Sequence, residues 1–176
     1  MADRCDEIAD RFDDQVVTKP EFKFWREAAN ASAFASLIGA RLVRLHDGER
    51  PDFAVNRDGL WEQFELTEAL QPGRRRGDEY KAPDHNSSKF DPYNDWVRRR
   101  QAIPEALKAS IHRKTSRIYQ DGCNLLIYLN LGTYGHWRED IEADIQRECA
   151  PALKQFKQVW VLWDGSAIEV SSGSDG

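Results

Sequence analysis

Two acidic residues occupy positions that a chain reversal would bring together. Asp52 lies in the stretch Glu49–Phe53, and Glu65 follows 13 residues later in the stretch Gln63–Thr67. The polar turn at 56–59 between them predicts a hairpin, which would place the two carboxylates side by side. Paired carboxylates are oxygen ligands for a hard cation such as Mg²⁺ or Mn²⁺, and such a cation can activate water for phosphodiester cleavage.

The second acidic residue belongs to an alternating polar and apolar pattern. Residues two apart on a strand share a face, so Gln63, Glu65 and Thr67 are expected to point together, away from Phe64 and Leu66. We therefore predict that Gln63 and Thr67 assist Glu65 as hydrogen-bonding neighbours. The alternative is an edge strand with a solvated face and no chemical role.

A lysine interrupts an apolar stripe on the helix expected from about 104 to 119. At spacings of four, four, three and four, the stripe reads Ile103, Leu107, Ile111, Lys114 and Ile118. A buried ammonium needs a carboxylate or a phosphate as partner. Lys114 is therefore predicted to meet Glu65 and to orient the attacking water or stabilise the charge on the phosphate. In the alternative, Lys114 extends along the helix flank into solvent.

The elements that position these residues follow from periodicity and turn signals. A capping box at 18–21 predicts a helix that Gly39 closes. Then follow strands at 41–45, 51–55 and 60–70, a short helix at 94–100, a helix at 104–119, a strand at 125–129, a helix at 138–148, a helical turn from Pro151, and a hairpin of 159–163 with 167–170. This order predicts an α/β fold with a mixed sheet flanked by helices.

Length and composition indicate one domain. The 176 residues divide into an N-terminal leader at 1–17, a domain at 18–170 and a flexible tail at 171–176. No apolar run approaches the roughly 20 residues of a membrane span, and the N-terminus lacks the order of a signal peptide. The three cysteines are far apart and match neither a disulfide framework nor a zinc spacing. We expect a cytoplasmic protein without a membrane partner; a homodimer is compatible with the sequence.

Basic residues concentrate in the middle of an acidic chain. The net charge is −5, yet residues 74–117 contain 12 Lys and Arg against 6 Asp and Glu, leaving 13 against 24 elsewhere. Such asymmetry is typical of a surface that meets phosphates. The predicted nucleic-acid contacts are Arg74, Arg75, Arg76, Arg98, Arg99 and Arg100. The alternative is a solvated arginine-rich loop without a partner.

Several other chemistries lack their motifs. The four histidines show no metal-ligand spacing, and neither a glycine-rich phosphate loop nor a Gly-x-Ser-x-Gly elbow occurs. Nucleotide hydrolysis and serine esterase chemistry therefore have no support.

The motif Pro51–Asp52, the motif Glu65-Leu66-Thr67 and the element order resemble the PD-(D/E)XK nuclease superfamily. This resemblance covers about residues 20–130 and implies a restriction-endonuclease-like fold with a core of helix, three strands, helix and strand. Thr67 stands where the family carries lysine; members that move this lysine to the following helix make Lys114 its counterpart. The resemblance implies a Mg²⁺- or Mn²⁺-dependent endo- or exonuclease acting on DNA rather than RNA, with Asp52 and Glu65 as metal ligands. It also makes Glu27 a further candidate carboxylate.

Two alternatives stay open at this point. Thr67 in the lysine position favours a catalytically inactive nuclease-fold module that binds nucleic acid or a protein partner. The tryptophans of the terminal hairpin, Trp160 and Trp163, would suit an oligomeric scaffold.

Overall fold

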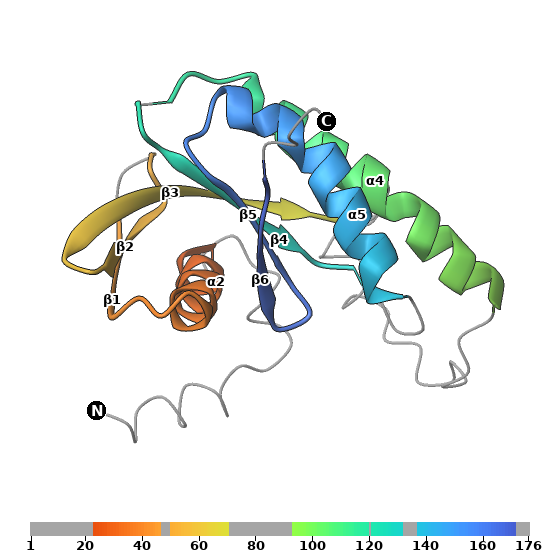
Figure 1. The fold of residues 1–176 in the computed structure, drawn as a ribbon, viewed down its shortest axis with the longest axis horizontal. Helices are drawn as coiled ribbons and strands as arrows, with labels where there is room; N and C mark the ends of the chain where they lie inside the picture. Colours follow the sequence, from red (N-terminus) through yellow and green to blue (C-terminus); the bar gives the residue numbers. More distant parts are fainter. Residues whose placement is uncertain (1–22, 47–49, 71–92, 120, 132–136, 172–176) are drawn as a thin grey trace.

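The protein's computed structural model describes residues 23–46, 50–70, 93–119, 121–131 and 137–171, without the side chains of 93–96 and 99. Its elements in chain order are α2 (Lys23–Leu37), β1 (Leu42–Leu45), β2 (Phe53–Arg57), β3 (Leu60–Ala69), α4 (Tyr93–Thr115), β4 (Asn124–Leu129), α5 (Arg138–Cys149), the 3-10 helix η2 (Ala150–Lys154), β5 (Val159–Trp163) and β6 (Ser166–Glu169). Figure 1 shows α2 on one side of the sheet and α4 beside α5 on the other.

The six described strands form one mixed sheet in sequence order, β1 to β6. The first three strands are antiparallel neighbours, β4 is parallel to β3, β5 is parallel to β4, and β6 returns antiparallel to β5. The two parallel steps contain the crossover helices α4 and α5. Because parallel crossovers are right-handed and both steps advance in the same direction, both helices lie on the same face.

Two hydrophobic clusters fill the two sides of the sheet. On one side, α4 and α5 pack Ile103, Leu107 and Ile141 against odd-numbered residues of β4 and β5 such as Leu125 and Val161. The same alternation shows to which face each side chain of β3 points. Ala69 belongs to this cluster, whereas Phe64 belongs to the opposite one. The odd-numbered side chains of β3, including Glu65 and Thr67, therefore face α4.

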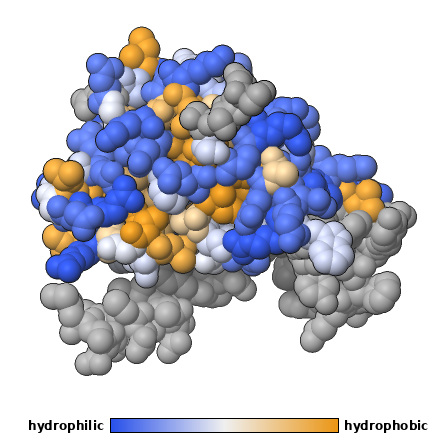
Figure 2. Space-filling model, in the orientation of Figure 1, coloured by the Kyte–Doolittle hydropathy of each residue, from blue (hydrophilic) through white to orange (hydrophobic). Residues whose placement is uncertain are grey.

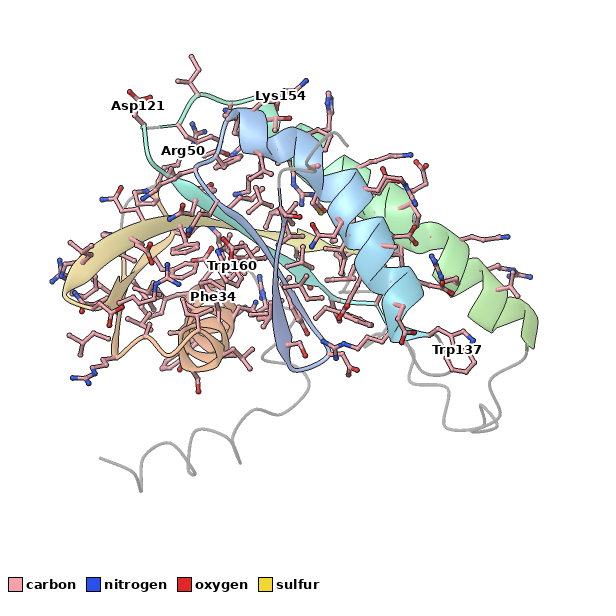
Figure 3. All side chains as sticks on the ribbon, viewed as in Figure 1. Phe34, Arg50, Asp121, Trp137, Lys154 and Trp160 are labelled. Atoms are coloured by element: carbon pink, nitrogen blue, oxygen red, sulfur yellow. The ribbon has the colours of Figure 1, made fainter. Side chains whose placement is uncertain are left out.

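On the other side, Phe34 of α2 is the centre of an aromatic cluster. Its ring centroid lies 5.0 Å from that of Phe64, 5.5 Å from that of Trp160 and 6.4 Å from that of Phe53. Figure 3 shows Phe34 and Trp160 close together beneath the sheet. These contacts fasten α2 to β2, β3 and β5 at once.

The predicted strands, the helix at 138–148 and the turn after Ala150 are confirmed with small shifts at their ends. Gly39 closes α2 with a φ of 72°, and the β2–β3 turn has positive φ at Asp58 and Gly59. The start of the first helix at 18–22, the leader at 1–17 and the tail from 172 onward lie outside the described residues.

The predicted break before Pro104 is wrong. One helix, α4, runs unbroken from Tyr93 to Thr115 with Pro104 inside it. A proline within a helix costs about 3 kcal/mol, but Ile103 and Leu107 on either side of it are fully buried. Their packing holds the helix together across the proline, and periodicity alone does not reveal that contribution.

The apolar stripe also ends earlier than predicted. Helix α4 stops at Thr115, and Ile118 is 91% exposed in the loop that follows. The stripe therefore covers Ile103 to Lys114 only.

The tryptophans of the terminal hairpin are core residues. Trp163 is 4% exposed, and the ring of Trp160 packs against Phe34. Both side chains make contacts within the chain, and the oligomeric scaffold built on this hairpin stays a prediction.

Exposed large apolar side chains occur instead on α2, β1 and the start of β3, as Phe24, Trp25, Leu37, Leu42, Val43, Leu60 and Trp61. Figure 2 shows apolar surface gathered on the side where Figure 1 places these elements, amid a mostly hydrophilic face. None of the helices in the described part of the chain combines the length and apolarity needed to cross a membrane.

Replacing Phe34 by Ala should lower the free energy of unfolding by about 3–5 kcal/mol, because it empties the centre of the aromatic cluster. The matched control is Phe24→Ala on the same helix, since Phe24 is 45% exposed. We expect that control to cost less than about 1 kcal/mol. Denaturant titration measures both, and equal losses would contradict the assignment of Phe34 as the anchor of α2.

Candidate active site

Asp52 is held by the backbone groups on either side of Glu65. The Asp52 amide donates to the carbonyl of Phe64 at 3.0 Å, and its Oδ2 accepts from the amide of Leu66 at 2.7 Å. The first bond continues the β2–β3 pairing to the residue before β2, and the second ties the side chain of Asp52 to β3. They fix the carboxylate of Asp52 next to position 65 in a place that is only 8% exposed.

Glu65 lies in the interior of the sheet. Strand β3 has β2 on one side and β4 on the other, and Glu65 is paired with Leu125 across the parallel ladder. Its side chain is 2% exposed. The alternative of a solvated edge strand is therefore wrong for this position.

The two oxygens of Glu65 differ in their surroundings. Oε1 accepts a hydrogen bond from Lys114 Nζ at 2.6 Å. Oε2 is buried and has no hydrogen-bond partner among the described residues. Buried polar atoms in native proteins are nearly always partnered, so an orphaned carboxylate oxygen requires an explanation.

Lys114 in the last turn of α4 completes the group. Its Nζ also lies 3.8 Å from Asp52 Oδ2, and the residue is 8% exposed. The alternative of a lysine extended into solvent is wrong. The sheet and the helix thus bring together Asp52, Glu65 and Lys114, which are far apart in the sequence.

The electrostatics of Glu65 reflect both its burial and its neighbours. Burial is the largest influence and raises the pKa of Glu65 above its ordinary value, while the hydrogen bond and charge of Lys114 act to lower it. The nearby charge of Asp52 raises this pKa further and that of Arg50 lowers it. Two ionised carboxylates against one ammonium leave one net negative charge, which suits a cation.

Thr67 occupies the position next to Glu65 on the same face and has a different partner. Its Oγ1 accepts a hydrogen bond from Arg113 Nη2 at 2.7 Å, and the same nitrogen donates to the carbonyl of Glu68 at 3.0 Å. Ser110 Oγ donates to that carbonyl as well, at 2.9 Å. These bonds pin the last two turns of α4 to β3 and so place Lys114 beside Glu65.

Gln63 is exposed and lines a cavity of about 150 Å³. The other lining residues are Arg50, Pro51, Ile118, Tyr119 and Cys123. Pro51 directly precedes Asp52, so the cavity adjoins the carboxylates. Figure 3 places Arg50 at the end of the sheet where the loop carrying Asp121 leads into β4.

The further carboxylate candidate Glu27 is paired with Lys23 at 3.2 Å on α2. That hydrogen bond is the main cause of a raised pKa of Lys23, and the charges of Asp52 and Glu65 raise it further. The first turn of α2 therefore lies within the electrostatic field of the acidic pair.

The predicted phosphate contacts remain a prediction. Arg74, Arg75 and Arg76 and the side chain of Arg99 lie outside the described residues, and Arg98 is exposed. Arg100 hydrogen-bonds to the carboxylate of Asp144 and donates to the carbonyl of Asp140, so its guanidinium fastens α4 to α5.

Sequence patterns missed several residues around the site. No sequence pattern assigned a role to Arg113, Arg50, Tyr119 and Cys123, although Arg50 directly precedes the motif Pro51–Asp52. Arg113 could have been found from its place before Lys114 on the helix. The contacts of Tyr119 and Cys123 depend on the loop between α4 and β4, whose path no periodicity predicts.

Comparisons of this chain with protein-family models, with curated proteins and with solved structures gave no match.

Replacing Lys114 by Met should lower the free energy of unfolding by about 3–5 kcal/mol in the absence of metal, because it leaves buried carboxylates without their cation. The matched control is Lys108→Met on the same helix, since the Lys108 side chain is 54% exposed and makes ion pairs of 3.5 and 3.6 Å with Glu105 and Glu148. We expect that control to cost less than about 1 kcal/mol. Similar losses in denaturant titrations of the two variants would show that Lys114 does not neutralise a buried pair.

Because its pKa is raised, Glu65 should make the free energy of unfolding depend on pH, and Glu65→Gln should remove this contribution. Well below the ordinary value of 4.5, Glu65 is protonated in the folded and the unfolded chain alike. As the pH rises above 4.5, the unfolded chain releases this proton first, so the stability that Glu65 contributes declines until the pH passes the raised pKa.

Denaturant titrations in EDTA from about pH 4 to pH 8 measure this effect. The free energy of unfolding of the wild type minus that of Glu65→Gln should fall across the window and then level off. A difference that rises with pH would mean that Lys114 outweighs burial at this carboxyl.

Proposed function

We propose that the protein is a metal-dependent nuclease that hydrolyses phosphodiester bonds, with DNA as its substrate. The observation that carries this proposal is the buried Oε2 of Glu65, which has no partner among the described residues and stands beside Asp52 and Lys114. A carboxylate oxygen kept out of water without a hydrogen bond is costly unless a cation takes its lone pairs.

The donor set fits Mg²⁺ or Mn²⁺. Asp52 and Glu65 offer hard carboxylate oxygens, and Mg²⁺ is commonly bound by one or two carboxylates together with water and substrate phosphate. Among the described residues no group of three or more His, Cys, Asp and Glu side chains is placed to hold a metal. A cation held by Asp52 and Glu65 would take its remaining ligands from water and substrate phosphate. When bound, the cation would lower the pKa of a water molecule and neutralise charge on the phosphate.

Lys114 would act on the negative charge that develops at the phosphate. An ammonium has three donors, and one of them is directed to Glu65 Oε1. Among the described residues the other donors make no hydrogen bond, so they could orient a water molecule or a phosphate oxygen. Because the amine is largely buried, its interaction with a developing charge is stronger than it would be in water.

The arrangement of the elements supports the restriction-endonuclease-like fold within this proposal. Helix α2 precedes three antiparallel strands, α4 crosses over, and β4 adds in parallel, which is the core order that the resemblance implies. Thr67 holds Arg113, while Lys114 from α4 reaches the carboxylate that a lysine at position 67 would serve.

The choice of DNA rests on the resemblance and on the basic middle of the chain. Those of the 12 Lys and Arg between 74 and 117 that the fold does not engage, unlike Arg100, Arg113 and Lys114, would neutralise backbone phosphates, so affinity for DNA should fall with salt. Only part of this segment lies within the described residues.

One observation favours the alternative of an inactive module. Lys114 Nζ lies 2.6 Å from Glu65 Oε1, a direct ion pair that stabilises the buried carboxylate without a metal. A module of this kind would bind nucleic acid or a protein without cleaving either.

The test incubates the protein with plasmid and single-stranded DNA, with Mn²⁺, with Mg²⁺ or with EDTA. The wild type should cleave only with metal, and Asp52→Asn, Glu65→Gln and Lys114→Ala should each reduce the rate at least about 100-fold. Two matched controls should keep the cleavage rate within about twofold of the wild-type rate. They are Glu62→Gln, on the opposite face of β3, and Lys108→Ala, on the surface of α4.

DNA binding is measured in parallel in EDTA, where no cleavage occurs. Metal-independent binding by the wild type together with absence of cleavage under every condition would establish the inactive module. Cleavage that survives in Asp52→Asn and Glu65→Gln would place the reaction elsewhere in the molecule.

A further inference from the structure

The cavity beside the carboxylates has a polar wall that the proposed reaction does not use. Arg50, Gln63 and Tyr119 contribute this wall, and Pro51, Ile118 and Cys123 close the remainder. Burial is the main cause of a raised pKa of Tyr119, and the charges of Glu65 and Asp52 raise it further, so this wall lies within electrostatic reach of the acidic pair. A ligand in the cavity would therefore sit next to the reacting centre.

The hydroxyl of Tyr119 is the first sign that the cavity is built for a ligand. It is buried and has no hydrogen-bond partner among the described residues. The ring packs against Phe156, with 4.9 Å between centroids, and Cζ of Arg50 lies 5.4 Å from its centre. With the ring engaged in this way, the hydroxyl is the group that Tyr119 can offer to a ligand.

Arg50 is the second sign. Among the described residues its guanidinium donates one hydrogen bond, from Nη1 to the carbonyl of Ile118 at 3.3 Å. A guanidinium has five donors. That bond and the contact with Tyr119 fix the plane of the group, and the other donors form a fork suited to phosphate oxygens.

The size of the cavity limits the ligand. Its volume of about 150 Å³ is well below the roughly 300–1,000 Å³ of pockets for drug-sized molecules. A phosphate group fits this space, whereas a whole nucleotide would have to extend out of it. Stacking of a base on Tyr119 is also disfavoured, because Arg50 and Phe156 already contact its ring.

The cysteine in the wall does not change this chemistry. Burial raises the pKa of the Cys123 thiol to about 11, so the thiol is neutral at physiological pH. A neutral thiol is neither a strong nucleophile nor a metal ligand. Cys123 therefore acts as an apolar part of the wall.

We infer that this cavity binds a second phosphate group of the nucleic-acid strand, held by the guanidinium of Arg50 and the hydroxyl of Tyr119 and bordered by the amide of Gln63. This inference rests on the proposed function, because it places the phosphate beside the one to be cleaved. The phosphate has two sources: a terminal phosphomonoester or an internal phosphodiester.

The experiment measures binding in EDTA by fluorescence anisotropy. The probes are single-stranded DNA oligonucleotides of one sequence, bearing a 5′-phosphate, a 3′-phosphate or hydroxyls at both ends. The variants are Tyr119→Phe, which removes only the orphaned hydroxyl, and Arg50→Gln. Each has a matched control: Tyr128→Phe, on the α2 side of the sheet, and Arg44→Gln, whose guanidinium lies over Trp61 away from the cavity.

Both cavity variants should weaken binding by about tenfold to a hundredfold, which corresponds to the loss of one charge-assisted hydrogen bond. The controls should stay within about twofold. If the loss is confined to one phosphorylated oligonucleotide, the cavity takes a terminal phosphate. If it is equal for all three, the cavity takes an internal one. Thermal melting should show Tyr119→Phe to be as stable as the wild type or more so, because the removed hydroxyl has no described partner.

The outcomes separate this inference from the proposed function. Metal-dependent cleavage by the wild type, with unchanged binding by Tyr119→Phe and Arg50→Gln, overturns the phosphate cavity and leaves the nuclease intact. Absence of cleavage with the expected loss of binding keeps the cavity and overturns the catalysis. A wild type that binds none of the oligonucleotides overturns the cavity as well.

Discussion

A buried ion pair between a helix and the middle of the sheet is the constraint on which the site depends. Glu65 is carried into the interior by β3, and the amine of Lys114 meets its Oε1 at 2.6 Å. Burying either charge alone is unfavourable, so each residue requires the other. The last turn of α4 can therefore settle in one place on β3, with Arg113 and Ser110 bonded to the strand around it.

The acidic partner is fixed by the backbone rather than by another side chain. Asp52 Oδ2 accepts from the amide of Leu66, and the amide of Asp52 donates to the carbonyl of Phe64. Both bonds are made to the residues that flank Glu65. The distance between the two carboxylates is thus set by the pairing of β2 with β3, which the aromatic cluster around Phe34 stabilises from the opposite face.

Among the six buried side-chain polar atoms of the described residues that have no hydrogen-bond partner, two belong to the candidate site and its cavity, the Oε2 of Glu65 and the hydroxyl of Tyr119. Unpartnered buried groups lower stability, and they concentrate where a ligand completes them. A cation at the first and a phosphate at the second would satisfy both with the parts of one substrate complex. The ligand-free protein would then be less stable than one with all its buried polar groups partnered, but its site would already be arranged to bind the ligand.

Local pattern was enough to predict the strands, the hairpin that joins Asp52 to Glu65, and the inward face of Lys114. Each of these depends on residues close in the sequence or on one helical period. Tertiary structure alone decided that α4 continues through Pro104, that Thr67 binds Arg113, and that Arg50 meets Ile118, 68 residues away, and its neighbour Tyr119. Those outcomes depend on packing and on the path of a loop, because contacts between distant segments leave no period in the sequence.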